Sequence, residues 1–319
     1  MDFNAIIKVI KDAHSIIISA HTNPDGDAIG AMVAVGYICI YYNKPYTILL
    51  EEPSKAYKDL LEDMCFTSHI EGGADTFIAL DSGDKNRLVG YETYFKEATY
   101  TINIDHHVTN SSFAQYNYID AQASSTSELV YKLIEEAQIP LNKALAKALY
   151  TGILTDTNGF MHSCTNPSTH LMAAELIKLP FNFSALYEKT LQEKTIETAR
   201  LQAQATSHMK ELSTPGVYLS YLTSKEVAQI GASKEDMDGV IGYLKTIKGV
   251  NLIAFIYPKE GQGPTYKLSM RGNPPYNVAA FCQSFGGGGH ERAAGATLEG
   301  KLEEVLERIE QAVSAFVKS

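Results

Sequence analysis

The sequence predicts an α/β fold: a parallel sheet wrapped by helices, joined by a long helix to a smaller mixed α/β domain. Three observations predict it. Short apolar runs alternate with helix-like segments through the first half of the chain. The 319 residues exceed the roughly 250–300 that one hydrophobic core usually supports. A segment without glycine or proline separates two regions of different pattern.

Four short runs rich in β-branched and aromatic residues account for the strands of the first sheet. They are SIIISA (15–20), YTILL (46–50), TFIAL (76–80) and YTINI (100–104). Helix-like segments separate most of them, and this alternation is typical of parallel strands joined by crossover helices. The stretch 27–42, rich in Ala, Ile, Val and Met, is expected to be a buried crossover helix.

Helical patterns dominate residues 124–178, with predicted starts at SSTS (124–127) and at Asn142, because Ser and Asn often cap helices. Residues 187–212 lack Gly and Pro, which predicts one long helix before Pro215. Strand-like and helix-like segments follow it in a smaller mixed unit. We therefore expect a first domain at 1–186, a helical linker at 187–212 and a second domain at 213–319.

Composition limits the function. The formal charge of −10 argues against a groove that binds long duplex nucleic acid, because affinity for such polyanions comes largely from phosphate neutralisation. It leaves small phosphorylated substrates open. The opening lacks a secretory leader pattern, and the longest apolar stretch, 28–42, is shorter than the ~20 residues of a membrane span. Four widely spaced cysteines without a Cys-x-x-Cys pair predict free thiols in a cytoplasmic protein.

Acidic residues and histidines follow several of the apolar runs, and we interpret them as a two-metal hydrolase centre. The first segment, HTNPDGD (21–27), combines Pro24, which fixes one backbone angle, with Gly26, which permits a tight turn. Its spacing lets several side chains converge on a cation. Oxygen-rich ligands with imidazole favour Mn²⁺, with Mg²⁺ as the alternative. Asn-Pro-Asp-Gly is also ordinary turn sequence, so a turn without metal stays open for this segment alone.

Asp81 follows the strand TFIAL and is the best candidate for a carboxylate that bridges two cations. For Asp84 we prefer a helix-capping role. Arg87, shortly afterwards, has two interpretations: a phosphate contact or a surface ion pair.

Asp105-His106-His107 ends the strand YTINI. Adjacent side chains on extended backbone point to opposite sides, so the two histidines should differ in role. We assign His106 as a metal ligand and His107 as a phosphate or leaving-group contact, or general acid, with Asp105 orienting the loop. Asp156 stands where an apolar helix gives way to small polar residues. Taken alone, Asp156 would be interpreted as a turn residue. Together with the other acidic and histidine segments, it is interpreted as a metal ligand.

These segments, in this order, resemble the DHH phosphoesterase superfamily, and all its ligand positions are present. The resemblance implies two metal ions, Mn²⁺ or Mg²⁺, per active site. It implies that one ion is bound by His21, Asp25 and Asp81, and the other by Asp27, Asp81, His106 and Asp156.

The second domain carries two features suited to phosphate. Four glycines, 286–289, precede His290, and we expect their amides to be free to surround an anion. The alternative interpretation of the glycine run is a flexible hinge without a ligand. Arg271 ends a strand and offers a guanidinium for bidentate phosphate binding, unless it is an ordinary surface arginine. Both resemble the DHH-associated domain, in which such residues face the metal site across a cleft. The resemblance implies that substrate is bound by Arg271, Gly287, Gly288, Gly289 and His290.

By size and organisation the chain resembles the bacterial nano-RNase and pAp phosphatase branch. That branch implies Mn²⁺-dependent hydrolysis of short single-stranded RNA to nucleoside 5′-monophosphates and conversion of 3′-phosphoadenosine 5′-phosphate (pAp) to AMP. In both reactions a ribose 3′ oxygen is the leaving group. This shared chemistry favours cleavage of the RNA from its 5′ end. One alternative is a phosphodiesterase acting on linear or cyclic dinucleotides of the pApA type. The other is a nucleotide-binding regulator without catalysis, although its usual mark, a missing ligand, is absent. The oligomeric state stays undetermined, with a homodimer as the candidate.

Overall fold

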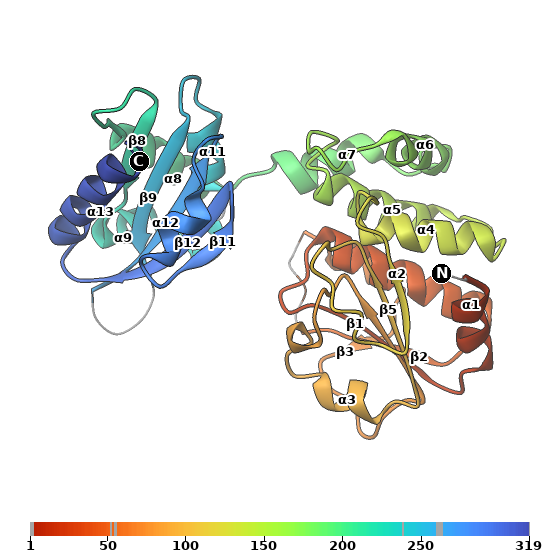
Figure 1. The fold of residues 1–319 in the computed structure, drawn as a ribbon. Coiled ribbons are helices and arrows are strands. Elements are labelled where there is room, and N and C mark those ends of the chain that lie inside the picture. The colour runs from red at the N-terminus through yellow and green to blue at the C-terminus, as the bar shows by residue number, and fades with distance from the viewer. Residues whose placement is uncertain (1–2, 52, 54–55, 238, 260–263, 319) are drawn as a thin grey trace. The chain divides into compact units, whose positions relative to one another are not determined.

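The computed structural model describes residues 3–51, 53, 56–237, 239–259 and 264–318. The chain divides into two compact units, Met1–Glu193 and Lys194–Ser319. Each unit has its own sheet and hydrophobic core (Figure 1).

The first unit is built on a six-stranded sheet in the order β3-β2-β1-β4-β5-β6, and every neighbouring pair is parallel. Its strands are β1 (Ile16–Ala20), β2 (Tyr46–Leu49), β3 (Phe66–Thr67), β4 (Thr76–Leu80), β5 (Tyr100–Asp105) and β6 (Tyr116–Ile119). Strands β1 and β4 are buried along their whole length, as expected when both faces of a parallel sheet are covered. The predicted parallel sheet is therefore confirmed.

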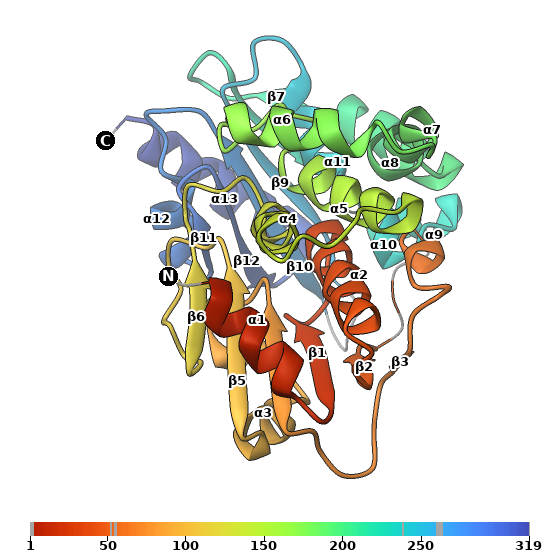
Figure 2. The same cartoon turned by 90° about the vertical axis from the view of Figure 1, so that its right-hand side faces the viewer.

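Helices cover both faces of this sheet (Figure 2). The α-helices are α1 (Phe3–Asp12), α2 (Gly26–Tyr41), α3 (Glu92–Glu97), α4 (Thr126–Glu136), α5 (Lys143–Asp156), α6 (Pro167–Leu176) and α7 (Phe183–Tyr187). Short 3₁₀-helices form at η1 (Lys58–Leu60) and η2 (Lys85–Arg87). Helix α2 is the predicted buried crossover, and Ser125 and Asn142 cap α4 and α5 as predicted.

The prediction of one long helix over 187–212 is wrong. Helix α7 ends at Tyr187 and a π-helix, η3 (Glu188–Gln192), follows it; the chain is then extended before α8 (Ile196–Ser207). Thr195 causes the new start, because its side chain accepts a hydrogen bond from the Thr198 amide and caps α8. The absence of Gly and Pro did not reveal this cap. The unit boundary falls within the extended stretch.

The second unit has a mixed six-stranded sheet in the order β11-β12-β10-β9-β8-β7, in which only β8 and β9 pair in parallel among the described residues. The strands are β7 (Lys210–Glu211), β8 (Val217–Tyr221), β9 (Leu252–Pro258), β10 (Thr265–Gly272), β11 (Gly288–His290) and β12 (Ala293–Glu299). Its other helices are α9 (Ser224–Ile230), α10 (Lys234–Met237), α11 (Val240–Thr246), α12 (Val278–Gln283) and α13 (Leu302–Phe316). None of the helices in the described ranges has the length and apolar character needed to cross a membrane.

Side chains alternate between two cores along β9 and β10. Leu268 and Met270 pack with α12 and α13 on one face, whereas Phe255 packs with α8 and α11 on the other. The residues that alternate with Leu268 and Met270 on β10 are half-buried, and their partners on β12 are half-buried or exposed; these β10 residues are Lys267, Ser269 and Arg271. The second sheet thus has an open, polar region over β10 and β12.

Candidate metal centre

The loops that follow β1, β4 and β5 meet at the carboxyl edge of the first sheet, where parallel strands place ligand sites. Three groups of side chains there each bring one possible ligand atom per residue to within 4.8 Å of the others. The groups are His21, Asp25 and Asp81; Asp27, His106 and Asp156; and Asp81, His106 and His107. All six predicted metal ligands therefore converge, and Asp81 and His106 each belong to two groups.

Asp81 lies at the middle of the cluster and is 3% exposed. Its φ of 51° turns the chain sharply where β4 ends, and its amide donates to the Ile104 carbonyl of β5 at 3.0 Å. The two carboxylate oxygens face different partners: Oδ2 lies 3.3 Å from His21 Nε2 and Oδ1 lies 3.7 Å from His106 Nε2. Burial raises the pKa of Asp81, but the hydrogen bond from His21 and the other imidazoles outweigh it, so the pKa is lowered.

The first loop combines the two roles that the sequence left open. Asp25 Oδ1 accepts hydrogen bonds from the amides of Asp27 and Ala28, so Asp25 caps α2 as a turn residue would. It also lies in the group with His21 and Asp81. Burial lowers the pKa of His21, but its hydrogen bonds to Asp81 and to the Thr22 carbonyl outweigh this, and the pKa is raised.

Asp27 is held by the first turn of α4, a contact that the sequence analysis missed. The Thr126 amide donates to Oδ2 at 2.7 Å and the Ser127 amide to Oδ1 at 2.9 Å. Thr126 Oγ1 also donates to Asp81 Oδ1 at 3.0 Å, so one residue ties two predicted ligands together. Helix N-termini favour anions. The run SSTS therefore indicated a site for a carboxylate as well as the start of a helix. Burial, together with Asp81 and Asp156, raises the pKa of Asp27 well above its usual value.

Gly152 makes room for this contact. A Cβ at Gly152 would overlap Ser127 Oγ and lie 2.7 Å from Asp27 Oδ1. Helix α5, which contains Gly152, therefore packs against α2 and α4 only because the side chain is absent. The same helix ends at Asp156, whose Oδ2 lies 3.1 Å from His106 Nε2. Burial, reinforced by Asp81 and Asp25, raises the pKa of Asp156 to about 7.

The two adjacent histidines differ in environment. Their rings are tilted by 57°, and His107 Nδ1 lies 2.7 Å from Asp105 Oδ1. Asp105 is fully buried, and Asn110 donates to its other oxygen. The hydrogen bond to Asp105 raises the pKa of His107 to about 9. Asp105 thus fixes the orientation of His107 and favours its protonated form.

Two further predictions concern the loop after Asp81. Asp84 caps η2 by accepting a hydrogen bond from the Asn86 amide at 2.8 Å, which confirms the preferred capping role. Arg87 is exposed. Its positive charge acts on both His21 and His107, where it partly opposes the raised pKa of each imidazole. Arg87 therefore lies near the centre, which favours the phosphate-contact interpretation.

The donor set fits divalent cations. Four carboxylates, Asp25, Asp27, Asp81 and Asp156, converge with imidazoles, and none of them forms an ion pair with a lysine or arginine among the described residues. Buried like charges are unfavourable without a counter-charge. Carboxylate oxygens with imidazole nitrogens suit Mn²⁺ and related ions.

In the second unit, β-sheet pairing aligns Arg271 and His290. Arg271 pairs with Ala293 of β12, and Ala293 pairs with His290 of β11. Directly opposed residues share a face, so the two side chains project from the same side about 10 Å apart. Arg271 Nη1 donates to the Met270 carbonyl at 3.0 Å, and burial lowers the pKa of Arg271.

The expectation that all the glycine amides are free is wrong. Gly286 and Gly287 donate to the carbonyls of Gln283 and Cys282, which ends α12. The glycines are instead required by close packing: a Cβ at Gly287 would overlap the Gly295 carbonyl, and one at Gly289 would lie 2.5 Å from the Ala293 carbonyl. By contrast, Gly288 has open space at its Cβ position.

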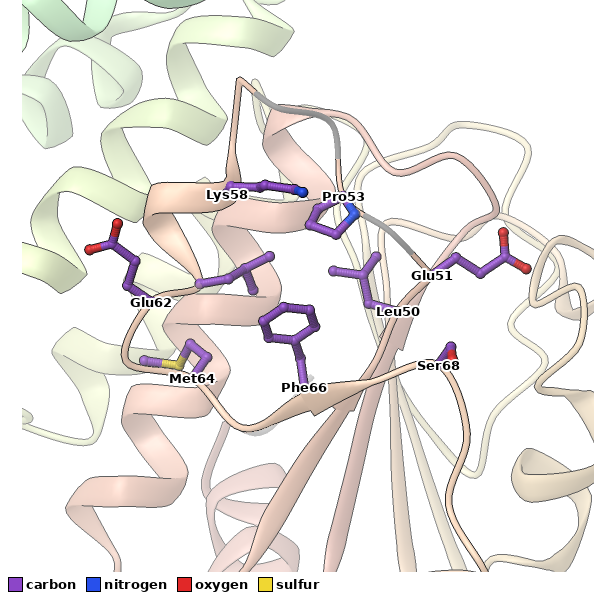
Figure 3. A pocket seen from close by; sticks show the side chains of 9 residues that line it. Leu50, Glu51, Pro53, Lys58, Glu62, Met64, Phe66 and Ser68 are labelled. Atoms are coloured by element: carbon purple, nitrogen blue, oxygen red, sulfur yellow. The ribbon is translucent and has the colours of Figure 1, made fainter.

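A separate cavity of about 470 Å³ lies at the carboxyl ends of β2 and β3, on the same edge of the sheet as the cluster (Figure 3). Leu50, Pro53 and Phe66 point toward one another across it, and Phe66 is 43% exposed. None of the predicted metal ligands lines it.

Comparisons with known proteins agree with the geometry. The DHH family, N-terminal domain, matches residues 15–153, and the DHHA1 domain matches residues 217–318. The chain is 31% identical over 308 residues to the bifunctional oligoribonuclease and PAP phosphatase NrnA of Thermus thermophilus, covering 93% of this chain and 89% of that protein.

Two solved structures show the same fold. An exopolyphosphatase-related protein from Bacteroides fragilis superposes with a TM-score of 0.87 at 25% identity, covering 98% of this chain and 96% of that chain. RecJ from T. thermophilus in complex with Mn²⁺ superposes with a TM-score of 0.53 at 14% identity, covering 98% of this chain and 54% of that chain, and shares the fold alone. The resemblance inferred from the sequence is confirmed: the chain belongs to the DHH family and carries a DHHA1 domain.

Proposed function

We propose that this protein is a Mn²⁺-dependent phosphoesterase that hydrolyses short oligoribonucleotides to nucleoside 5′-monophosphates and converts pAp to AMP. The observation that carries the proposal is the position of Asp81, whose two oxygens face two separate groups of ligand atoms. The T. thermophilus relative, whose name states both activities, supports the choice of substrates.

Six side chains would hold two metal ions. His21, Asp25 and Asp81 would bind one, and Asp27, His106 and Asp156 the other. Asp81 would be shared, because its Oδ1 lies 3.7 Å from His106 Nε2 of the second set. When bound, such a pair lowers the pKa of a water, orients it for in-line attack and offsets charge on the phosphate oxygens. Thr126 supports this arrangement because it fixes the carboxylates of Asp27 and Asp81 at once.

His107 is the proposed general acid. Its Nδ1 is engaged by Asp105, and this hydrogen bond raises the pKa of His107 and favours the protonated ring. The proton on Nε2 can then pass to the ribose 3′ oxygen as it leaves. The same leaving group occurs in pAp and at the first linkage of a 5′-terminal nucleotide, which supports cleavage from the 5′ end.

The second unit would bind phosphate. Arg271 offers a planar pair of donors, and His290 and Gly288 lie on the edge strand β11, which β12 separates from the strand of Arg271. We propose that they hold a non-scissile phosphate, so that they contribute mainly to substrate affinity.

A turnover assay over 5′-labelled RNAs of graded length tests the proposal, with pAp, pApA and polyphosphate alongside and Mn²⁺ or Mg²⁺ supplied. We expect Mn²⁺-dependent release of nucleoside 5′-monophosphates from the shortest RNAs and of phosphate from pAp. Preferred turnover of pApA over other dinucleotides would instead support a signal-dinucleotide phosphodiesterase. No turnover of any nucleotide with either ion would overturn the proposal.

A further inference from the structure

A further group of basic side chains lies beside the open region of the second sheet. A cavity of about 400 Å³ lies over β9 and β10, beside α9 and α10. Three lysines, Lys234, Lys259 and Lys267, line it, together with a wall that includes Val227, Met237 and Tyr257. The predicted substrate residues Arg271 and His290 do not line this cavity.

The three lysines gather in a protein whose net charge is −10. None of them forms an ion pair within the ranges that the structure describes, and Lys259 makes a single weak hydrogen bond, 3.4 Å long, to Thr297 Oγ1. One carboxylate, that of Asp236, accepts hydrogen bonds from the hydroxyls of Ser233 and Thr195 and does not line the cavity, so the three lysines still leave a local excess of positive charge. A local excess of positive charge in a concave site attracts anions.

The wall of the cavity is suited to a nucleobase. Val227 and Met237 present carbon atoms, and the ring of Tyr257 is held by stacking on Phe255, with centroids 5.1 Å apart and planes 29° apart. An apolar wall beside a cationic rim is the combination with which proteins bind units of single-stranded nucleic acid.

Lys267 connects the cavity to the predicted phosphate site. It lies on the same face of β10 as Arg271, four residues and about 13 Å away. Its amine lies over β12 at Gly295, since a Cβ there would lie 3.5 Å from Lys267 Nζ, and Gly295 pairs with Gly288 of the glycine run. A strip of positive charge therefore runs from the cavity toward Arg271 and His290.

We propose that this cavity binds a distal nucleotide of oligoribonucleotide substrates longer than a dinucleotide, with its phosphates on Lys234, Lys259 and Lys267. The proposal rests on the proposed function and extends it: Arg271 and His290 suffice for dinucleotides and pAp, whereas the cavity adds affinity for longer chains.

The test is a triple variant, Lys234→Gln, Lys259→Gln and Lys267→Gln, compared with the matching Lys→Arg triple. Binding of a 5′-labelled pentaadenylate is followed by fluorescence anisotropy with EDTA present, so that no turnover is needed. We expect the Gln triple to bind at least tenfold more weakly. The slope of log affinity against log salt should become shallower by about 2, because each phosphate contact on a single strand contributes about 0.7. The Arg triple should retain both properties.

Lys248→Gln is the matched control, since Lys248 is exposed in the turn after α11 and outside the cavity. Dinucleotide and pAp turnover should be unchanged in the Gln triple, which also shows that it folds. Three results would each overturn the proposal. The salt slope could be unchanged in the Gln triple, or the triple could lose as much affinity for the dinucleotide as for the pentanucleotide. The third is that AMP competes for binding as strongly as the pentanucleotide does. If the unaltered protein cleaves no RNA, the proposed function fails, but the anisotropy measurement still decides whether the cavity binds RNA.

Discussion

The carboxyl edge of the first sheet and the open face of the second differ in charge, burial and support. At the first, carboxylates are buried and tied by hydrogen bonds, as Asp27 and Asp81 are by Thr126. At the second, basic side chains such as Lys267 are half-buried or exposed and have few partners in the described part of the chain. The contrast suggests a rigid centre for chemistry and an adaptable surface for affinity. Changes at the first should therefore alter rate, metal binding and stability, and changes at the second should alter substrate affinity.

The largest effect should come from Asp81→Ala. Removing the carboxylate that both groups share should lower kcat by about 10³-fold or more and reduce bound manganese. Elemental analysis and single-turnover rates measure the two effects together. The matched change Asp84→Ala removes only the cap of η2 and should leave manganese content unaltered. Near-normal manganese in the Asp81 variant would contradict the bridging role.

Glu128→Gln tests the support beneath the centre. Glu128 is 1% exposed and accepts hydrogen bonds from Ser124, Ser168 and Thr169, while Lys132 lies 3.0 Å away. Burial raises the pKa of Glu128, but these partners outweigh it and lower the pKa to about 2 from the usual 4.5. The group is therefore more easily ionised when folded. Its stabilisation, up to about 3 kcal/mol, is fully present above pH 4.5 and is lost as pH falls toward 2.

Urea unfolding at neutral and acidic pH measures this dependence. The Gln variant should lose stability at pH 7 and differ less from the unaltered protein as pH falls below 4.5. Glu175→Gln is the control, because Glu175 forms an exposed pair with Lys178 that should contribute less than about 1 kcal/mol. A Gln variant that is as stable as the unaltered protein at pH 7 would show that the ionised Glu128 network does not stabilise the fold.

Gly152→Ala tests the packing around Asp27. The added Cβ overlaps Ser127 Oγ, so we expect a loss of about 1–3 kcal/mol in unfolding free energy and weaker manganese binding. Gly242→Ala is the matched control, since a Cβ there meets nothing within 4 Å and alanine favours a helix interior. Thermal unfolding and manganese titration compare the two. Equal behaviour would mean that the centre tolerates displacement of Asp27.

Arg271→Ala should give the smallest change. It tests whether the second region contributes to substrate affinity and not to rate. Loss of a charged hydrogen-bonding partner costs about 1.5–3 kcal/mol, so KM for dinucleotide and pAp should rise about tenfold or more, with kcat within a few-fold. Arg308→Ala, on α13, is the control for a lost guanidinium. A fall in kcat with unchanged KM would break the division between the two regions.

Much of the first unit could be predicted from local sequence. The apolar runs SIIISA and TFIAL were correctly predicted as strands, and residues that end such strands meet at one edge once the strands are parallel. The capping roles of Ser125 and Asp84 also follow from side-chain chemistry near one turn. The break before α8 was missed because Thr195 caps a helix without the glycine or proline that usually marks an end.

The sequence by itself determined the types of residue available for metal and phosphate, and the strand ends that carry them, because these depend on composition and short spacing. Only the tertiary structure decided which atoms meet. Thr126 reaches Asp27 across 99 positions of the chain, and the three lysines of the cavity come from α10, the end of β9 and β10. Contacts of that range depend on how helices and strands pack, which no local pattern encodes.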